Sequence, residues 1–126
     1  MSKKIKISSE NFHTTATLNN TKWADYLYKN LPIEGSSQFW GDELFFSTPI
    51  NMEEDADSLE VVNIGDIAFW PPGSAFCIFW GPTPMSRDEE IRPVSKVNLL
   101  GSIDSQLLKI KDINAGNKMV ISRFED

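Results

Sequence analysis

The segment that most constrains the fold of this chain is residues 65–82, with the sequence GDIAFWPPGSAFCIFWGP. It contains five of the 14 aromatic residues of the protein. Two runs of apolar residues, 66–70 and 75–80, flank a Pro-Pro-Gly break, and this pattern is typical of two strands joined by a turn. We therefore predict a hairpin. Because both runs are apolar on both faces, we expect the hairpin to lie inside a barrel or beneath a covering element.

Most of the remaining chain is also predicted to form strands. In residues 3–7, lysines alternate with isoleucines, which is the two-residue period of a half-buried strand. Gly41-Asp42 is a favoured hairpin turn, so it joins the strands on either side. The further strands are expected at residues 14–18, 34–40, 43–47, 59–63, 97–100 and 118–124.

One helix and a second short helix complete the prediction. The first begins at Lys22, after a capping Asn20 or Thr21, and ends before Pro32. The second spans 104–110. Residues 52–57 and 81–93 are expected to be an acidic loop and a proline-rich charged loop. About eight strands with one or two short helices indicate a mainly β fold, a closed antiparallel barrel, because closure removes exposed sheet edges.

The composition predicts one globular domain over residues 1–126, with 40% hydrophobic and 24% charged residues. The net charge of −6 argues against a nucleic-acid partner, because phosphate binding requires clustered Lys and Arg. No apolar run approaches the roughly 20 residues of a membrane span, so no membrane partner is expected. The first residues, MSKKIKISSENF, lack a hydrophobic signal-peptide core. A single cysteine fits a reducing compartment, and we predict a cytoplasmic protein.

Catalytic and metal-binding motifs are not found in the sequence. His13 is the only histidine, so a Ser-His-Asp or Cys-His arrangement would depend on it alone. Cys77 lies in an apolar run, where a cysteine is usually part of the core. One Cys and one His do not supply a zinc site, and the acidic residues 53–57 lack the glycine and terminal Glu of a calcium loop. We assign no catalytic residue, metal or cofactor.

Four blocks of the sequence resemble the small prokaryotic cyclophilin-like family: WGDELFF at 40–46, GDIAFWPPG at 65–73, FCIFWGPTP at 76–84 and VNLLG at 97–101. Their order and spacing extend the resemblance over nearly the whole chain. It implies a cyclophilin-type barrel of about eight strands with helices closing its ends. Members of this family mostly have no assigned biochemical role. The Phe-His-Arg and Gln-Gly-Gly-Asp blocks of true cyclophilins are missing, so the resemblance does not imply prolyl isomerase activity.

An excess of aromatic residues, which includes Trp70, suggests that some rings line a cleft rather than the core. Packing of all these rings in the core is the alternative. Glu43 is a carboxylate within an apolar strand, and it either accepts a ligand's donor or points to solvent. The predicted ligand-binding residues are Trp40, Glu43, Phe69, Phe79, Trp80 and Arg92.

Three functions remain open from the sequence. The preferred one is a barrel that binds a small molecule or a peptide segment without catalysis, with Arg92 as an anchor. The second is a weak or atypical peptidyl-prolyl cis-trans isomerase, which requires an arginine or another donor beside an open apolar pocket. The third is a protein-protein interaction module, including a homo-oligomer, formed by exposed aromatic residues. A pocket favours the first two, and a flat apolar patch favours the third.

Overall fold

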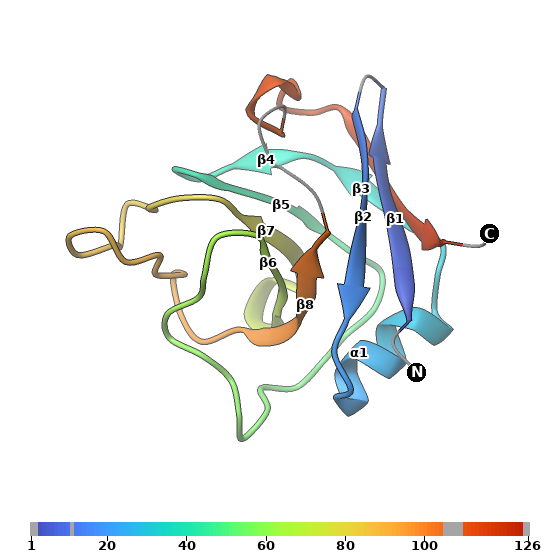
Figure 1. The fold of residues 1–126 in the computed structure, drawn as a ribbon, viewed down its shortest axis with the longest axis horizontal. Helices are drawn as coiled ribbons and strands as arrows, with labels where there is room; N and C mark the ends of the chain where they lie inside the picture. The colour runs from blue at the N-terminus through green and yellow to red at the C-terminus, as the bar shows by residue number, and fades with distance from the viewer. Residues whose placement is uncertain (1–2, 11, 105–109, 125–126) are drawn as a thin grey trace.

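The computed structural model describes residues 3–10, 12–104 and 110–124, which form nine strands, one α-helix and two short 3-10 helices. The strands build a single antiparallel sheet in the order β3-β9-β1-β2-β8-β6-β7-β5-β4 (Figure 1). The elements are β1 (Lys4–Ser9), β2 (Phe12–Leu18), α1 (Lys22–Lys29), β3 (Ile33–Ser36), β4 (Gln38–Phe39), β5 (Glu43–Ser47), β6 (Asp66–Trp70), η1 (Pro71–Gly73), β7 (Ala75–Phe79), β8 (Asn98–Ile103), η2 (Ile110–Asp112) and β9 (Lys118–Arg123). The predicted mainly β barrel is confirmed.

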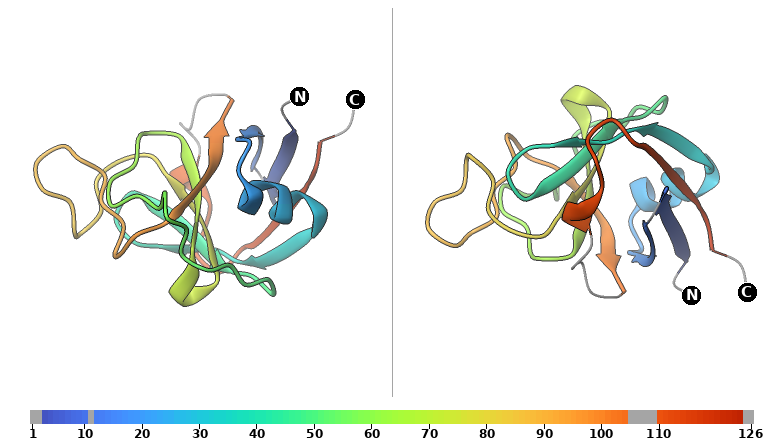
Figure 2. Two further views of the ribbon diagram at one scale, coloured as in Figure 1. Left: turned by 90° about the horizontal axis from the view of Figure 1, so that it is seen from below. Right: turned by 90° about the horizontal axis from the view of Figure 1, so that it is seen from above.

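The barrel is nearly closed because the two edge strands of the sheet, β3 and β4, follow one another in the chain (Figure 2). Ser37 separates them, and its backbone N–H and its hydroxyl donate to the carbonyl oxygens of Asn117 and Asn114. At Gly35, an added Cβ would lie 2.7 Å from the carbonyl oxygen of Ser47. A side chain there would collide with β5, so glycine allows β3 and β5 to approach each other.

The central hairpin is confirmed, since β6 and β7 pair antiparallel and η1 forms the turn between them. Two predicted strands differ from the structure. Residues 34–40 are divided between β3 and β4, because the chain changes partner at Ser37 from β9 to β5. Residues 59–63 make only isolated bridges, from Leu59 to Val97 and from Val62 to Ile91, because this segment crosses over the sheet as a covering loop. The division adds one strand and the loss of residues 59–63 removes one, and the structure has nine strands where about eight were predicted.

The predicted first helix is confirmed as α1, which Thr21 caps by accepting the N–H of Ala24. Its buried residues, Ala24 and Leu27, join the core cluster of the barrel interior. The predicted second helix falls largely on residues 105–109, which lie outside the described residues. The helices that the structure describes are all too short and polar to span a membrane.

Both faces of the central hairpin are buried, as the apolar pattern predicts. The inner face packs into the barrel core, while the outer face is covered by two long loops, residues 48–65 and 80–97. In Figure 1 the loop of residues 80–97, yellow to orange, extends away from the β1–β2 hairpin. Val62, Ile91 and Val97 from the loops form a second core cluster with the outer face. The expected covering element is therefore a pair of loops.

Candidate functional site

A pocket of about 190 Å³ opens on the outer face of the sheet, beneath the loop of residues 80–97. The residues that line this outer-face pocket are Trp40, Glu43, Phe45, Trp70, Cys77, Pro93, Val94 and Val97. Most of them are apolar or aromatic, and Glu43 is the only carboxylate among them. The pocket therefore combines an apolar wall with a single strong hydrogen-bonding group.

Strand register explains why these side chains share one face. Phe45 on β5 lies opposite Cys77 on β7, and directly opposed residues of antiparallel strands project to the same side. Glu43 precedes Phe45 by two residues, so it projects to that side as well. Trp40 joins them through the β4–β5 hairpin, where the backbones of Trp40 and Glu43 exchange two hydrogen bonds of 3.0 and 3.2 Å across Gly41-Asp42.

Glu43 is unusual for a carboxylic acid, because it is only 6% exposed in a pocket lined mostly by apolar side chains. Burial raises the pKa of its carboxyl to about 7, and interaction with the Cys77 thiol offsets this only in part. Among the residues that the structure describes, no lysine or arginine pairs with this carboxyl. At neutral pH the carboxyl is therefore present in both its acid and its carboxylate form, without a cation of the protein beside it.

The thiol of Cys77 forms part of the pocket floor and is 1% exposed. Burial, and then the neighbouring Glu43 carboxylate, raise its pKa well above the ordinary value. The nucleophilic species of cysteine is the thiolate, which this environment disfavours. Cys77 therefore contributes packing and a weak hydrogen bond rather than covalent chemistry.

Hydrogen bonds hold the covering loop in place over the sheet. The indole N–H of Trp70 donates to the hydroxyl of Ser95 over 2.6 Å, which ties β6 to the loop. Within the loop, the hydroxyl of buried Thr83 donates to the carbonyl oxygen of Arg92, and the N–H of Arg92 donates to the hydroxyl of Ser86 over 3.0 Å. The pocket is therefore formed by the fold before any ligand binds.

Of the predicted ligand-binding residues, only Trp40 and Glu43 line this pocket. Phe69 is fully buried in the barrel core, because it projects to the inner face. Phe79 is fully buried in the outer cluster, beneath the loops. Trp80 packs against the barrel core and against the edge of Phe39, with ring centroids 6.0 Å apart.

Arg92, the predicted anchor, also lies outside the pocket lining. Its guanidinium pairs with the carboxylate of Glu90 and lies 3.8 Å from the carboxylate of Glu60. The hydrogen bond to Glu90 raises the pKa of Arg92 further. The arginine is therefore engaged within the covering loops.

Sequence reasoning missed several lining residues. Phe45 follows Glu43 by two residues, so strand periodicity already places both on one face. Trp70 was part of the aromatic excess, but only the structure shows that its side chain lies on the outer face of β6, where the residue pairs with Ala75 of β7. The loop residues Pro93, Val94 and Val97 carried no sequence signal for a site.

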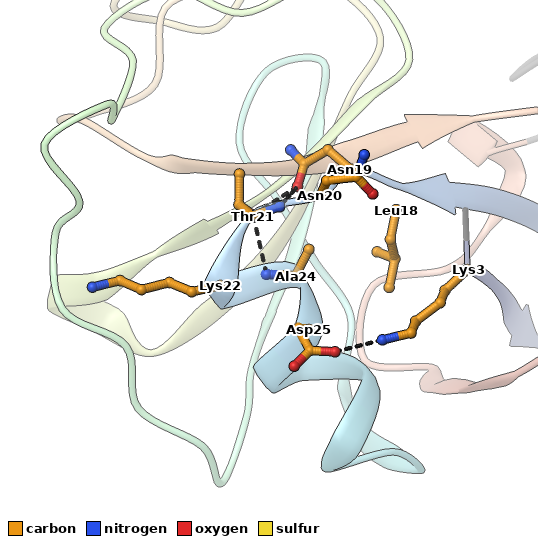
Figure 3. A pocket seen from close by; sticks show the side chains of 8 residues that line it. All are labelled: Lys3, Leu18, Asn19, Asn20, Thr21, Lys22, Ala24 and Asp25. Atoms are coloured by element: carbon orange, nitrogen blue, oxygen red, sulfur yellow. Dashed lines mark hydrogen bonds and ion pairs between the residues drawn. The ribbon is translucent and has the colours of Figure 1, made fainter. Parts of the chain in front are cut away.

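A second hollow, of about 440 Å³, lies beside the start of α1 (Figure 3). Its side chains interact with one another: Lys3 forms an ion pair with Asp25, and the Thr21 hydroxyl accepts the N–H of Ala24. Since these polar groups already have partners in the protein, they offer a ligand little new interaction. We therefore take the smaller outer-face pocket as the candidate site.

The described residues include no group of three or more His, Cys, Asp or Glu side chains placed to hold a metal ion. Fold and pocket together define a nearly closed antiparallel barrel with a preformed hollow on its outer wall.

Residues 3–122 match the model of the family described as Cyclophilin-like, and the chain belongs to this family. A similar solved structure is the solution structure of a hypothetical protein from Archaeoglobus fulgidus. It is 34% identical in sequence, the match covers 98% of this chain and 95% of the archaeal chain, and the TM-score is 0.83. No curated protein matches the sequence.

Proposed function

We propose that this cyclophilin-like barrel binds a small molecule, or one side chain of a peptide segment, in the outer-face pocket without catalysing a reaction. The observation that carries the proposal is the position of Glu43, a nearly buried carboxyl in a preformed pocket that is otherwise apolar and aromatic. Concave apolar sites with a few convergent polar groups are typical of ligand binding.

The volume of the pocket limits the size of the ligand group that it can bind. Its volume of about 190 Å³ lies below the roughly 300–1,000 Å³ of sites for drug-sized ligands. The ligand group is therefore about the size of one ring or one amino-acid side chain. Trp40, Phe45 and Trp70 supply aromatic surface for it, and Glu43 supplies the polar contact that orients it.

Binding without catalysis agrees with the chemistry of the lining. The Cys77 thiol has a raised pKa, and Arg92 is paired with Glu90 away from the pocket. An isomerase would need a hydrogen-bond donor aimed at the proline amide, and no arginine is among the lining residues. The interaction module finds less support, because the aromatic residues of this face surround a hollow rather than a flat patch.

The test is a nuclear magnetic resonance titration of the ¹⁵N-labelled protein with a set of small ring compounds and short peptides. We expect binding to shift the indole signals of Trp40 and Trp70 and the amide of Val94. Trp40→Ala should weaken that binding, while Trp23→Ala, which removes another half-buried tryptophan on α1, should not. Shifts that are absent from the pocket, or that survive Trp40→Ala unchanged, would contradict the proposal.

A prolyl isomerisation assay on an Ala-Pro peptide distinguishes binding from catalysis. The uncatalysed exchange takes tens of seconds or longer, and we expect the protein to leave this rate unchanged. Acceleration that is lost in Arg92→Ala would instead establish an isomerase with an unorthodox site.

A further inference from the structure

We infer that the ligand of the outer-face pocket is a small organic ammonium cation, with its charge beside Glu43 and its apolar part against Trp40, Phe45 and Trp70. This inference rests on the proposed function and adds the chemical class of the ligand. It follows from a juxtaposition in the structure: one buried carboxyl and three aromatic side chains face the same small hollow.

The first argument concerns the charge of Glu43. Removing a carboxylate from water costs free energy unless a partner compensates, and among the described residues no basic side chain provides one. Arg92, the anchor expected from the sequence, is held by Glu90 and Glu60. A ligand that carries a positive charge would therefore provide the Glu43 carboxylate with the cationic partner that the described side chains do not provide.

The second argument concerns the aromatic walls. The face of an indole or phenyl ring carries negative potential, so it attracts a cation, and tryptophan does so most strongly. Two tryptophans and one phenylalanine line the pocket together with Glu43. An anionic ligand would meet repulsion from the carboxylate and from the ring faces, and no lining residue is basic.

The third argument concerns the rest of the ligand. Pro93, Val94 and Val97 form an apolar side of the pocket, which suits a hydrocarbon substituent on the nitrogen. The volume of about 190 Å³ admits a substituent of about one ring. The net charge of −6 also attracts cations toward the protein over longer distances.

The experiment compares two probes of nearly equal shape, benzylammonium and benzyl alcohol, which differ in charge. Dissociation constants are measured from the indole signals of Trp40 and Trp70 at pH 8. We expect benzylammonium to bind about tenfold more tightly, the size of a partly desolvated cation–π and charge contact. At pH 5.5 the preference should shrink, because Glu43 is then protonated while the amine stays charged. Cys77, the other titratable lining residue, stays a thiol at both values.

Two variants separate the possible results. Glu43→Gln should reduce the preference for the cation at pH 8 to the part that the aromatic rings alone provide, whereas Glu34→Gln, which removes an exposed carboxylate on β3, should keep the full preference. If both probes bind the parent protein equally, the cation inference is wrong and the proposed function stands. If neither these probes nor any neutral ring compound binds at the pocket, the proposed function fails as well.

Discussion

The two faces of the β6–β7 hairpin differ in what covers them and in what they contain. The inner face presents Ile67, Phe69, Phe76 and Ile78, all fully buried among the apolar side chains of the barrel core. The outer face lies under irregular loops, and around it the structure leaves a hollow that contains a carboxyl and a thiol. One short segment therefore serves two purposes: its inner residues stabilise the barrel, and its outer residues form the pocket.

The difference follows from the nature of the two covers. Strands that wrap around a barrel place their side chains at regular spacing, and such interiors pack without large voids. Loops meet a sheet only at some positions, such as the bridges from Leu59 to Val97 and from Val62 to Ile91. The space between such contacts allows a pocket, so the loop-covered face is where binding is expected.

The largest loss of stability should come from a substitution on the inner face of the hairpin. Phe76→Ala is expected to lower the free energy of unfolding by about 3–5 kcal/mol, because it opens a cavity in a fully packed core. Phe45→Ala, at a half-buried position beside the pocket, should cost about 1–2 kcal/mol. Urea unfolding measures both. Phe76→Leu replaces the alanine variant if that variant does not fold, and equal losses at the two positions would contradict the comparison.

The second prediction concerns the carboxyl on the outer face. The pKa of Glu43 is about 7 in the folded protein and near its ordinary 4.5 in the unfolded chain. Between these values the folded state holds a proton that the unfolded chain has released, so stability falls as the pH rises through this window and stays lower above pH 7. The loss amounts to about 3 kcal/mol, and Glu43→Gln should abolish it.

Urea unfolding at pH 5 and pH 8 checks this prediction. Glu43→Gln should be more stable than the parent at pH 8, while Glu34→Gln should follow the parent at both values. Burial also raises the pKa of Asp66, and this group acts in the same direction in all three proteins. A parent protein that is equally stable at pH 5 and pH 8 would show that Glu43 is well hydrated.

A third prediction tests the closure of the barrel around the inner face. Gly35→Ala would place a Cβ 2.6 Å from the Cδ2 atom of Phe46, one of the core rings. We expect a loss of about 1–3 kcal/mol in the free energy of unfolding, because the core would have to shift. Ser36→Ala, at the next and exposed position of β3, should change stability little. Similar losses in both variants would point to β3 itself rather than to its approach to Phe46.

The smallest effect is expected at the rim of the pocket. Trp70→Phe removes the hydrogen bond from the indole N–H to Ser95 and should cost about 0.5–1 kcal/mol, because the bond lies near solvent. Ser95→Ala removes the same bond. The double variant should therefore lose about as much free energy of unfolding as either single variant, and less than the sum of the two losses. Amide hydrogen exchange in residues 92–97 should rise in all three. Unchanged exchange would show that the loop is held by other contacts.

The strands, the capped helix and the Gly41-Asp42 hairpin were predictable because their signals are local. The two-residue hairpin even placed Trp40 beside Glu43 correctly. The sequence did not determine which of the other aromatic residues line the pocket, for a specific reason. In a strand that is apolar on both faces, alternation says that Phe69 and Trp70 face opposite ways, but not which of them faces the core. The barrel turns Phe69 inward and Trp70 toward the pocket.

Local patterns were thus enough to establish that the central hairpin is covered on both faces, that the fold is mainly β, and that the chain carries excess negative charge. Long-range contacts decided the rest. Closure depends on β3 pairing with β9, and the pocket depends on where the loop of residues 80–97 meets the sheet. These pairings join residues far apart in sequence, and no periodicity within a segment specifies them. The burial of Glu43, on which the proposed binding rests, is a product of that assembly.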